Sequence, residues 1–250
     1  MSLLKQNEAD SSNNNDVRAR IGFLAIANAG IIENDMFSMK PDGVFLHFTR
    51  IPMGTEVNIK NLAGMEEGIG YAVDTIMSGR DDLDVICYNC TSGSFVIGEE
   101  KIINKIEEKR PSAKGTTMFT GVVHALQTLD VRKIAVGTAY TDDINELERK
   151  FLEDRGFEVI TIKGLNLLTD VDMNDVTPEA LVDFAISIDQ PEAEAIFLSC
   201  GGLRSTEVVQ TIEDKVQKPV ITSNQASFWN CLRQAGIQDK IAGFGKLFQY

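Results

Sequence analysis

Residues 84–90 read Asp-Val-Ile-Cys-Tyr-Asn-Cys, and residues 194–200 read Glu-Ala-Ile-Phe-Leu-Ser-Cys. Each stretch is a short apolar run that ends at a cysteine, and such a run is typical of a buried strand in a parallel sheet. Polar or glycine residues follow each cysteine, namely Thr-Ser-Gly-Ser after Cys90 and Gly-Gly-Leu-Arg after Cys200. The chain therefore contains one pattern twice: a buried strand, a cysteine, and then a turn into a helix.

Other segments repeat in the same order around these two stretches. Arg-Ile-Gly-Phe-Leu at 20–24 matches Lys-Ile-Ala-Val-Gly at 133–137, and the positions 116–126 match the positions 222–232. The offsets, 106 to 113 residues, are too long for a solenoid repeat and indicate duplication of one larger unit.

Short apolar runs alternate with helical patterns along the whole chain, which is typical of α/β proteins. The expected strands are 21–27, 44–51, 85–89, 133–137, 158–162 and 195–199, and the clearest expected helices are 65–78, 142–155 and 178–188. We therefore expect an α/β fold of two similar lobes, each a roughly four-stranded parallel sheet flanked by helices, related by a pseudo-twofold axis. Because ligands bind beyond the carboxyl ends of parallel strands, the lobes should share one cleft.

The same pattern gives an expected division of the chain. The opening residues are polar and lack periodicity, so 1–17 is expected to be a disordered tail. We assign 18–117 together with 225–250 to the first lobe, and 118–224 to the second.

Composition restricts the class of protein. Of 250 residues, 43% are hydrophobic and 24% are charged, which indicates a globular chain. The net charge of −13 disfavours binding to nucleic acids and to anionic membranes, whereas a small anion in a buried pocket is still allowed. The sequence has no apolar run long enough to cross a bilayer, and it has four cysteines, too few for a disulfide framework. We expect a cytoplasmic protein with free thiols.

Cys90 and Cys200 are the candidate catalytic residues. Duplication of the unit would bring the two thiols to opposite sides of the shared cleft. A cysteine at a helix N-terminus meets free N–H donors and the positive end of the helix dipole, which predicts a lowered thiol pKa. The alternative interpretation is that both are buried structural cysteines, which are common in strands.

The turns after the two cysteines have the composition of an anion cradle. Glycines allow the backbone to approach a ligand closely, and hydroxyl groups add hydrogen-bond donors for a carboxylate or an enediolate oxygen. These residues are Thr91, Ser92, Gly93, Ser94, Gly201 and Gly202.

Four segments, 90–94, 200–205, 219–229 and 137–145, together resemble the signatures of maleate cis-trans isomerases and arylmalonate decarboxylases. These enzymes belong to the aspartate/glutamate racemase superfamily. The resemblance implies two α/β lobes with the active site between them, Cys90 as the nucleophile and Cys200 as its partner. Arylmalonate decarboxylases have a glycine at the first of these positions, so the presence of both cysteines favours an isomerase or a racemase.

The resemblance also implies substrate contacts. Asn28 resembles a family asparagine that binds a substrate carboxylate, although alanine and glycine replace the hydroxyl residues that usually surround it. Tyr140 resembles a tyrosine that donates to a carboxylate, and Asn166 is assigned to a second carboxylate-binding asparagine. The implied substrate-binding set is Asn28, Thr91, Ser92, Tyr140, Asn166, Gly201 and Gly202.

These features favour a cofactor-independent, metal-free isomerase or racemase acting on a small carboxylic or dicarboxylic acid, foremost the conversion of maleate to fumarate. Two alternatives stay open: decarboxylation of a substituted malonate through Cys200 alone, and a non-enzymatic two-lobe binding protein, which needs no thiols. The expected partner is a small carboxylate substrate. A homodimer is compatible with the sequence because closed twofold assemblies are the commonest oligomers.

Several other polar residues have structural interpretations. His47 and His124 have no acid or nucleophile near them in the sequence, so each is expected to be structural. Arg50 resembles a recurrent family arginine and is expected to hold the cleft. Two roles fit Arg204 equally well, a contact to a substrate carboxylate and an ion pair with Glu207.

Overall fold

The computed structural model describes residues 17–250, so nearly all of the expected tail, 1–16, lies outside the described residues. Parallel strands form two four-stranded sheets, with the orders β2-β1-β3-β4 and β6-β5-β7-β8. The strands are β1 (Ala19–Ile26), β2 (Val44–Ile51), β3 (Val85–Asn89), β4 (Lys114–Thr117), β5 (Lys133–Thr138), β6 (Glu158–Gly164), β7 (Ala195–Ser199) and β8 (Val220–Thr222). The second order repeats the first, which confirms the predicted α/β fold of two similar lobes.

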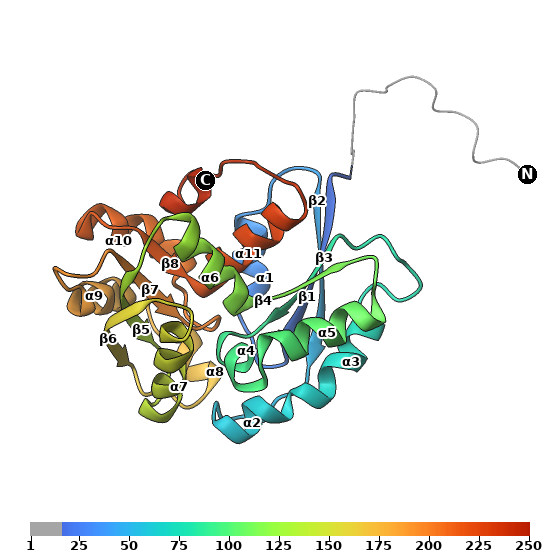
Figure 1. Cartoon of the computed structure of the whole chain (residues 1–250), viewed down its shortest axis with the longest axis horizontal. Helices are drawn as coiled ribbons and strands as arrows, with labels where there is room; N and C mark the ends of the chain where they lie inside the picture. The colour runs from blue at the N-terminus through green and yellow to red at the C-terminus, as the bar shows by residue number, and fades with distance from the viewer. Residues whose placement is uncertain (1–16) are drawn as a thin grey trace, which may run out of the picture.

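Helices cover the faces of both sheets (Figure 1). They are α1 (Ile32–Ser38), α2 (Ile59–Gly64), α3 (Glu66–Thr75), α4 (Thr91–Ile97), α5 (Glu99–Lys109), α6 (Met118–Thr128), α7 (Asp142–Glu153), α8 (Asp170–Asn174), α9 (Pro178–Ile188), α10 (Val209–Val216) and α11 (Ser223–Gln234), with short 3₁₀ helices η1 (Thr206–Val208) and η2 (Lys246–Gln249). In the described part of the chain, no helix is both long and apolar enough to cross a membrane.

Local sequence explains where several of these helices begin and end. The Thr177 side chain accepts a hydrogen bond from the backbone N–H of Ala180, and Pro178 occupies the first turn, so α9 begins as predicted. The helix expected at 65–78 is shorter, because Ile76 is extended and Met77 has a left-handed backbone with φ of 46°.

The central strands β3 and β7 are buried at every residue, because helices cover both faces of each sheet. Two hydrophobic clusters form the core, and each takes side chains from both lobes. Leu24 and Leu198 belong to one cluster, while Phe23 and Phe197 belong to the other. Side chains of both lobes therefore pack together in each cluster, and this packing fixes the positions of the strand ends that face each other.

Helices α6 and α11 follow the last strand of each sheet and pack against each other between the lobes (Figure 1). A Cβ added at Gly121 on α6 would lie 2.8 Å from the carbonyl oxygen of Ala226 and 2.9 Å from the Cα of Ser227 on α11. Only glycine allows the two backbones to approach this closely. The assignment of these helices to one lobe or the other stays a prediction.

Candidate active site

A pocket lies where β1, β3, β5 and β7 end. The residues that follow these four strands form its walls, and the 53–62 segment and α8 complete them. Its position agrees with the rule that ligands bind beyond the carboxyl ends of parallel strands.

Cys90 lines this pocket as the N-cap residue of α4. Its Sγ accepts a hydrogen bond from the backbone N–H of Gly93 at 3.3 Å and lies 3.8 Å from the Ser92 hydroxyl. The side chain is only 7% exposed, and burial raises the pKa of the thiol to about 11, against the smaller lowering effects of these two donors.

Cys200 lines the same pocket directly after β7. Its φ of 144° is strained for a residue with a side chain, and strain of this kind persists mainly at functional positions. The Sγ accepts a hydrogen bond from the backbone N–H of Gly202 at 3.3 Å. Burial, and to a smaller extent the nearby charge of Asp170, raises the pKa of this thiol to about 12.

The expectation that these helix-associated thiols have lowered pKa values is wrong for the free pocket. One backbone N–H at each sulfur does not compensate for the loss of water, so both thiols are neutral at physiological pH. At Cys200 the charge of Asp170 has a larger effect on the pKa than either hydrogen-bond donor, whereas at Cys90 the Gly93 and Ser92 donors each have a larger effect than Asp170.

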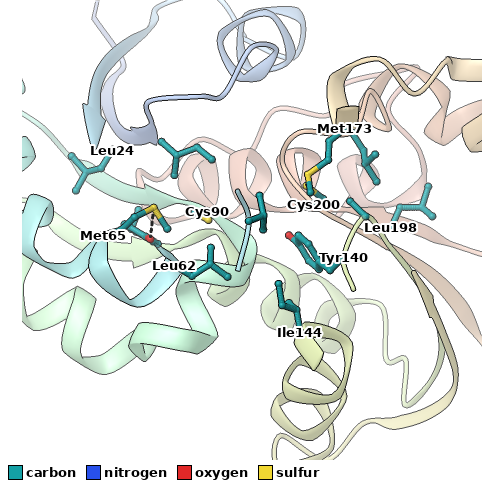
Figure 2. Close-up of a cluster of buried hydrophobic side chains, with 14 of the residues drawn as sticks. Leu24, Leu62, Met65, Cys90, Tyr140, Ile144, Met173, Leu198 and Cys200 are labelled. Atoms are coloured by element: carbon teal, nitrogen blue, oxygen red, sulfur yellow. Dashed lines mark hydrogen bonds between the residues drawn. The ribbon is translucent and has the colours of Figure 1, made fainter. Parts of the chain in front are cut away.

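Tyr140 lies between the two thiols. Figure 2 shows that its hydroxyl points into the space between Cys90 and Cys200. This hydroxyl faces both the Cys200 sulfur and the Ser92 hydroxyl, and burial raises its pKa well above the usual value. Tyr140 therefore keeps its proton and can donate it in a hydrogen bond to an anionic ligand.

Ser223, which the sequence interpretation missed, links the two cysteine turns. Its Oγ accepts one hydrogen bond from the Thr91 hydroxyl at 2.9 Å and another from the backbone N–H of Cys200 at 3.1 Å. This residue begins α11, so the helix between the lobes fixes the position of one turn relative to the other.

The structure brings most of the predicted site residues together. Those that line the pocket are Cys90, Thr91, Ser92, Tyr140, Cys200, Gly201 and Gly202. Asn28 and Asn166 are not among them. Asn28 donates to the carbonyl oxygen of Gly54 at 3.0 Å, while Asn166 is exposed and has a left-handed backbone with φ of 58°.

Asp170 lines the pocket and was also missed. It is the first residue of α8, is 4% exposed, and its Oδ2 has no hydrogen-bond partner within residues 17–250. The sequence around it, Thr169-Asp-Val-Asp172, signals only the start of a helix. Only the three-dimensional structure shows that this acidic residue faces the two cysteines.

The two arginines have structural partners. Arg50 donates to the carbonyl oxygens of Ile26 and Ala29 at 3.1 and 3.2 Å and pairs with Glu33, so it holds the loop after β1. Arg204 pairs with the exposed Glu207 at 2.7 Å, and this is the second of the two roles considered for it.

Comparison with known proteins agrees with this geometry. The family model described as arylmalonate decarboxylase matches residues 53–248. Arylmalonate decarboxylase of Bordetella bronchiseptica is 35% identical over 136 residues, which are 53% of this chain and 57% of that protein. Maleate isomerase of Nocardia farcinica is 25% identical over 92% of this chain and 95% of its own length.

A solved structure of the Nocardia farcinica maleate cis-trans isomerase, a cysteine-to-serine mutant with a covalently bound succinylcysteine intermediate, has the same fold. Its TM-score is 0.86 at 23% identity, and the match covers 92% of this chain and 98% of that one. The chain therefore belongs to the maleate isomerase and arylmalonate decarboxylase family of enzymes, as its sequence motifs predict.

Proposed function

We propose that the protein is a cofactor-independent isomerase or racemase that acts on a small carboxylic or dicarboxylic acid with two cysteines, and that conversion of maleate to fumarate is its leading reaction. One observation carries the proposal: Cys90 and Cys200 line one pocket, with the Tyr140 hydroxyl between them.

In the proposed reaction, Cys90 first loses its proton to solvent, and the resulting thiolate adds to one olefinic carbon while the Cys200 thiol gives its proton to the other. A C–S bond forms, the π bond breaks, and the remaining carbon–carbon bond can rotate. Elimination then breaks the C–S bond, returns the proton to Cys200 and releases the trans acid. The position of Cys90 at the N-terminus of α4, with the Gly93 N–H and the Ser92 hydroxyl at its sulfur, supports this division of roles.

Hydrogen-bond donors around the thiols support binding of the substrate carboxylate. We assign this role to the hydroxyls of Ser92 and Tyr140 and to the backbone N–H groups of Gly201 and Gly202. Thr91 acts mainly through its hydrogen bond to Ser223, which holds the Cys200 turn in place. The roles of Asn28 and Asn166 as substrate contacts remain predictions.

The solved relative supports the covalent step. It holds a covalently bound succinylcysteine, the adduct that a cysteine forms with maleate, in a protein of the same fold. We carry this chemistry to Cys90 because it is the thiol at the start of a helix, with donors on its sulfur.

Decarboxylation is the second candidate. The relative with the highest sequence identity given above is an arylmalonate decarboxylase, and an apolar wall of Met53, Val57 and Leu62 faces the thiols, which suits an aryl group. In that reaction Cys200 alone would protonate the carbanion left after carbon dioxide departs.

One experiment separates the reactions. The protein is incubated in deuterated water with maleate, an aryl malonate and a chiral α-substituted acid, and the products are followed by NMR. Formation of fumarate supports the isomerase, release of carbon dioxide with deuterium at carbon supports the decarboxylase, and deuterium exchange alone supports a racemase. No reaction with any compound contradicts the proposal and favours a binding protein.

Single variants test the residues. Cys200→Ala should lower isomerisation by about 10²- to 10⁴-fold, the usual contribution of a positioned acid or base. Cys90→Ala should abolish isomerisation, because the C–S bond of the intermediate can no longer form. Cys231→Ala, at a buried cysteine outside the pocket, is the matched control. Retained turnover in Cys200→Ala would remove this residue from the mechanism.

A further inference from the structure

Asp170 is the one ionisable carboxyl among the described residues that line the pocket. Burial and the lack of a partner on Oδ2 set it apart from the surface carboxylates of the chain. Met173, on the same helix, contacts the Cys200 sulfur at 3.5 Å, so α8 brings Asp170 close to the reacting centre.

The pocket has no compensating cation. In the part of the chain that the structure describes, neither lysine, arginine nor histidine lines it. A dianion bound here would hold one carboxylate at the hydroxyl and N–H donors and would bring its second negative charge near Asp170. Two like charges in a water-poor site repel strongly, and an ionised carboxylate can only accept hydrogen bonds.

We infer that Asp170 accepts a hydrogen bond from the substrate, so that the second polar group of the substrate binds in a protonated form. This inference rests on the proposed function and narrows its substrate class. A dicarboxylate binds with uptake of one proton, which its second carboxyl group shares with Asp170. A monocarboxylate that carries an amide or ammonium group at that position binds without proton uptake.

The electrostatics of Asp170 agree with this role. Burial raises its pKa, and the Asn28 side chain lowers it by a smaller amount. The other titratable groups that line the pocket are Cys90, Cys200 and Tyr140, and all three keep their protons near neutral pH. These three groups are therefore not the source of the proton uptake that we expect when a dicarboxylate binds.

Four other carboxyl groups lie on α1, on α8 and in the 53–62 segment, the elements that line the pocket together with Asp170. Asp35 on α1 accepts a hydrogen bond from Asn224 at 2.8 Å, and burial raises its pKa to about 6. Glu33 on α1 pairs with Arg50, and Glu56 and Asp172 are exposed. None of these four lines the pocket, so a variant of Asp170 separates its titration from theirs.

The test uses calorimetry on the full-length protein with succinate, a dicarboxylate without a double bond to isomerise, and with succinamate, its monoamide. Measurement in two buffers of different ionisation enthalpy, near neutral pH, gives the number of protons taken up with each ligand. The variant is Asp170→Asn, which keeps the shape of the side chain. The matched control is Asp175→Asn at the exposed end of α8.

For the wild type and the control we expect uptake of about one proton with succinate and none with succinamate. Succinate affinity should then weaken about tenfold per pH unit. Asp170→Asn should abolish the uptake, tighten succinate binding and weaken succinamate binding severalfold, because the amide N–H loses its charged acceptor. If Asp170 had only a structural role, its replacement would not be expected to raise the affinity for one ligand and lower the affinity for the other.

Three outcomes overturn the inference. If both ligands bind without proton uptake, or if Asp170→Asn retains the uptake, the inference fails while the proposed carboxylate site stands. If neither ligand binds, the carboxylate site itself fails, and the inference fails with it.

Discussion

Cys90 and Cys200 are buried in one pocket, with one backbone N–H directed at each sulfur. The free energy of removing a thiolate from water exceeds what one such donor returns, so the resting enzyme holds neutral thiols. The donors are nevertheless already in place, and they stabilise the negative charge once it forms during the reaction.

The rate of alkylation measures the protonation state of the Cys90 thiol directly. The rate of modification of Cys90 by iodoacetamide should rise from neutral pH to about pH 11, because only the thiolate reacts. At mildly alkaline pH it should be on the order of 100-fold slower than for free cysteine, whose pKa is about 8.5. Mass spectrometry of the Cys90 peptide gives the rate, and a plateau reached below neutral pH would contradict the burial argument.

Glu148 on α7 is a buried carboxyl group, as Asp35 and Asp170 are, and neither of its oxygens has a hydrogen-bond partner within the described residues. Burial raises its pKa from 4.5 to about 8, so the folded protein holds it protonated where the unfolded chain ionises it. Its contribution to stability is therefore complete below about pH 4.5 and is lost as pH rises to about 8.

Glu148→Gln should remove the loss of stability that the wild type shows as the pH rises to about 8. The variant and the wild type should have similar free energies of unfolding near pH 4.5, whereas well above pH 8 the variant should be more stable by on the order of 5 kcal/mol. Urea denaturation at several pH values checks this, with Glu146→Gln at an exposed position of the same helix as the control. Equal pH dependence in all three proteins would contradict the assignment.

At the scale of the elements, strand-to-helix units position the site. The strand cores at 85–89 and 195–199 were predicted with the bounds that the structure has, because each is a short apolar run that ends at a polar turn. Short helices such as α2 and α8 carry too few residues to show a period. The segment that brings Asp170 into the pocket was therefore not predictable from pattern.

The contact between α6 and α11 gives a prediction at this scale. Gly121→Ala should push two backbones apart and lower the free energy of unfolding by about 1–3 kcal/mol, the usual result of overpacking. Gly64→Ala on α2 is the control, because its Cβ meets no atom within 4 Å and alanine favours helices by up to about 1 kcal/mol. Denaturation midpoints compare the two, and equal stability of both variants would contradict close packing at Gly121.

At the scale of the molecule, duplication of one unit explains why the sequence predicted the two cysteines of the site. It does not reveal the residues that reach the site from the other lobe or from a connecting segment. Two equivalent strand ends face each other across a shared core, so their cysteines could be paired from the repeat alone. Asp170 and Ser223 act across lobes or from a connecting segment, and such contacts depend on chain placement that no local pattern encodes. The burial that sets both thiol pKa values likewise arises only when the lobes meet.

The account depends on the two thiols acting on one substrate molecule, and trapping of the covalent intermediate tests this most directly. Cys200→Ser protein is incubated with maleate, digested and examined by tandem mass spectrometry, beside wild type assayed for fumarate. We predict fumarate from the wild type and, in the variant, a succinyl group on Cys90. No fumarate from the wild type, or a variant that accumulates no adduct on Cys90 while it still forms fumarate, would contradict the account.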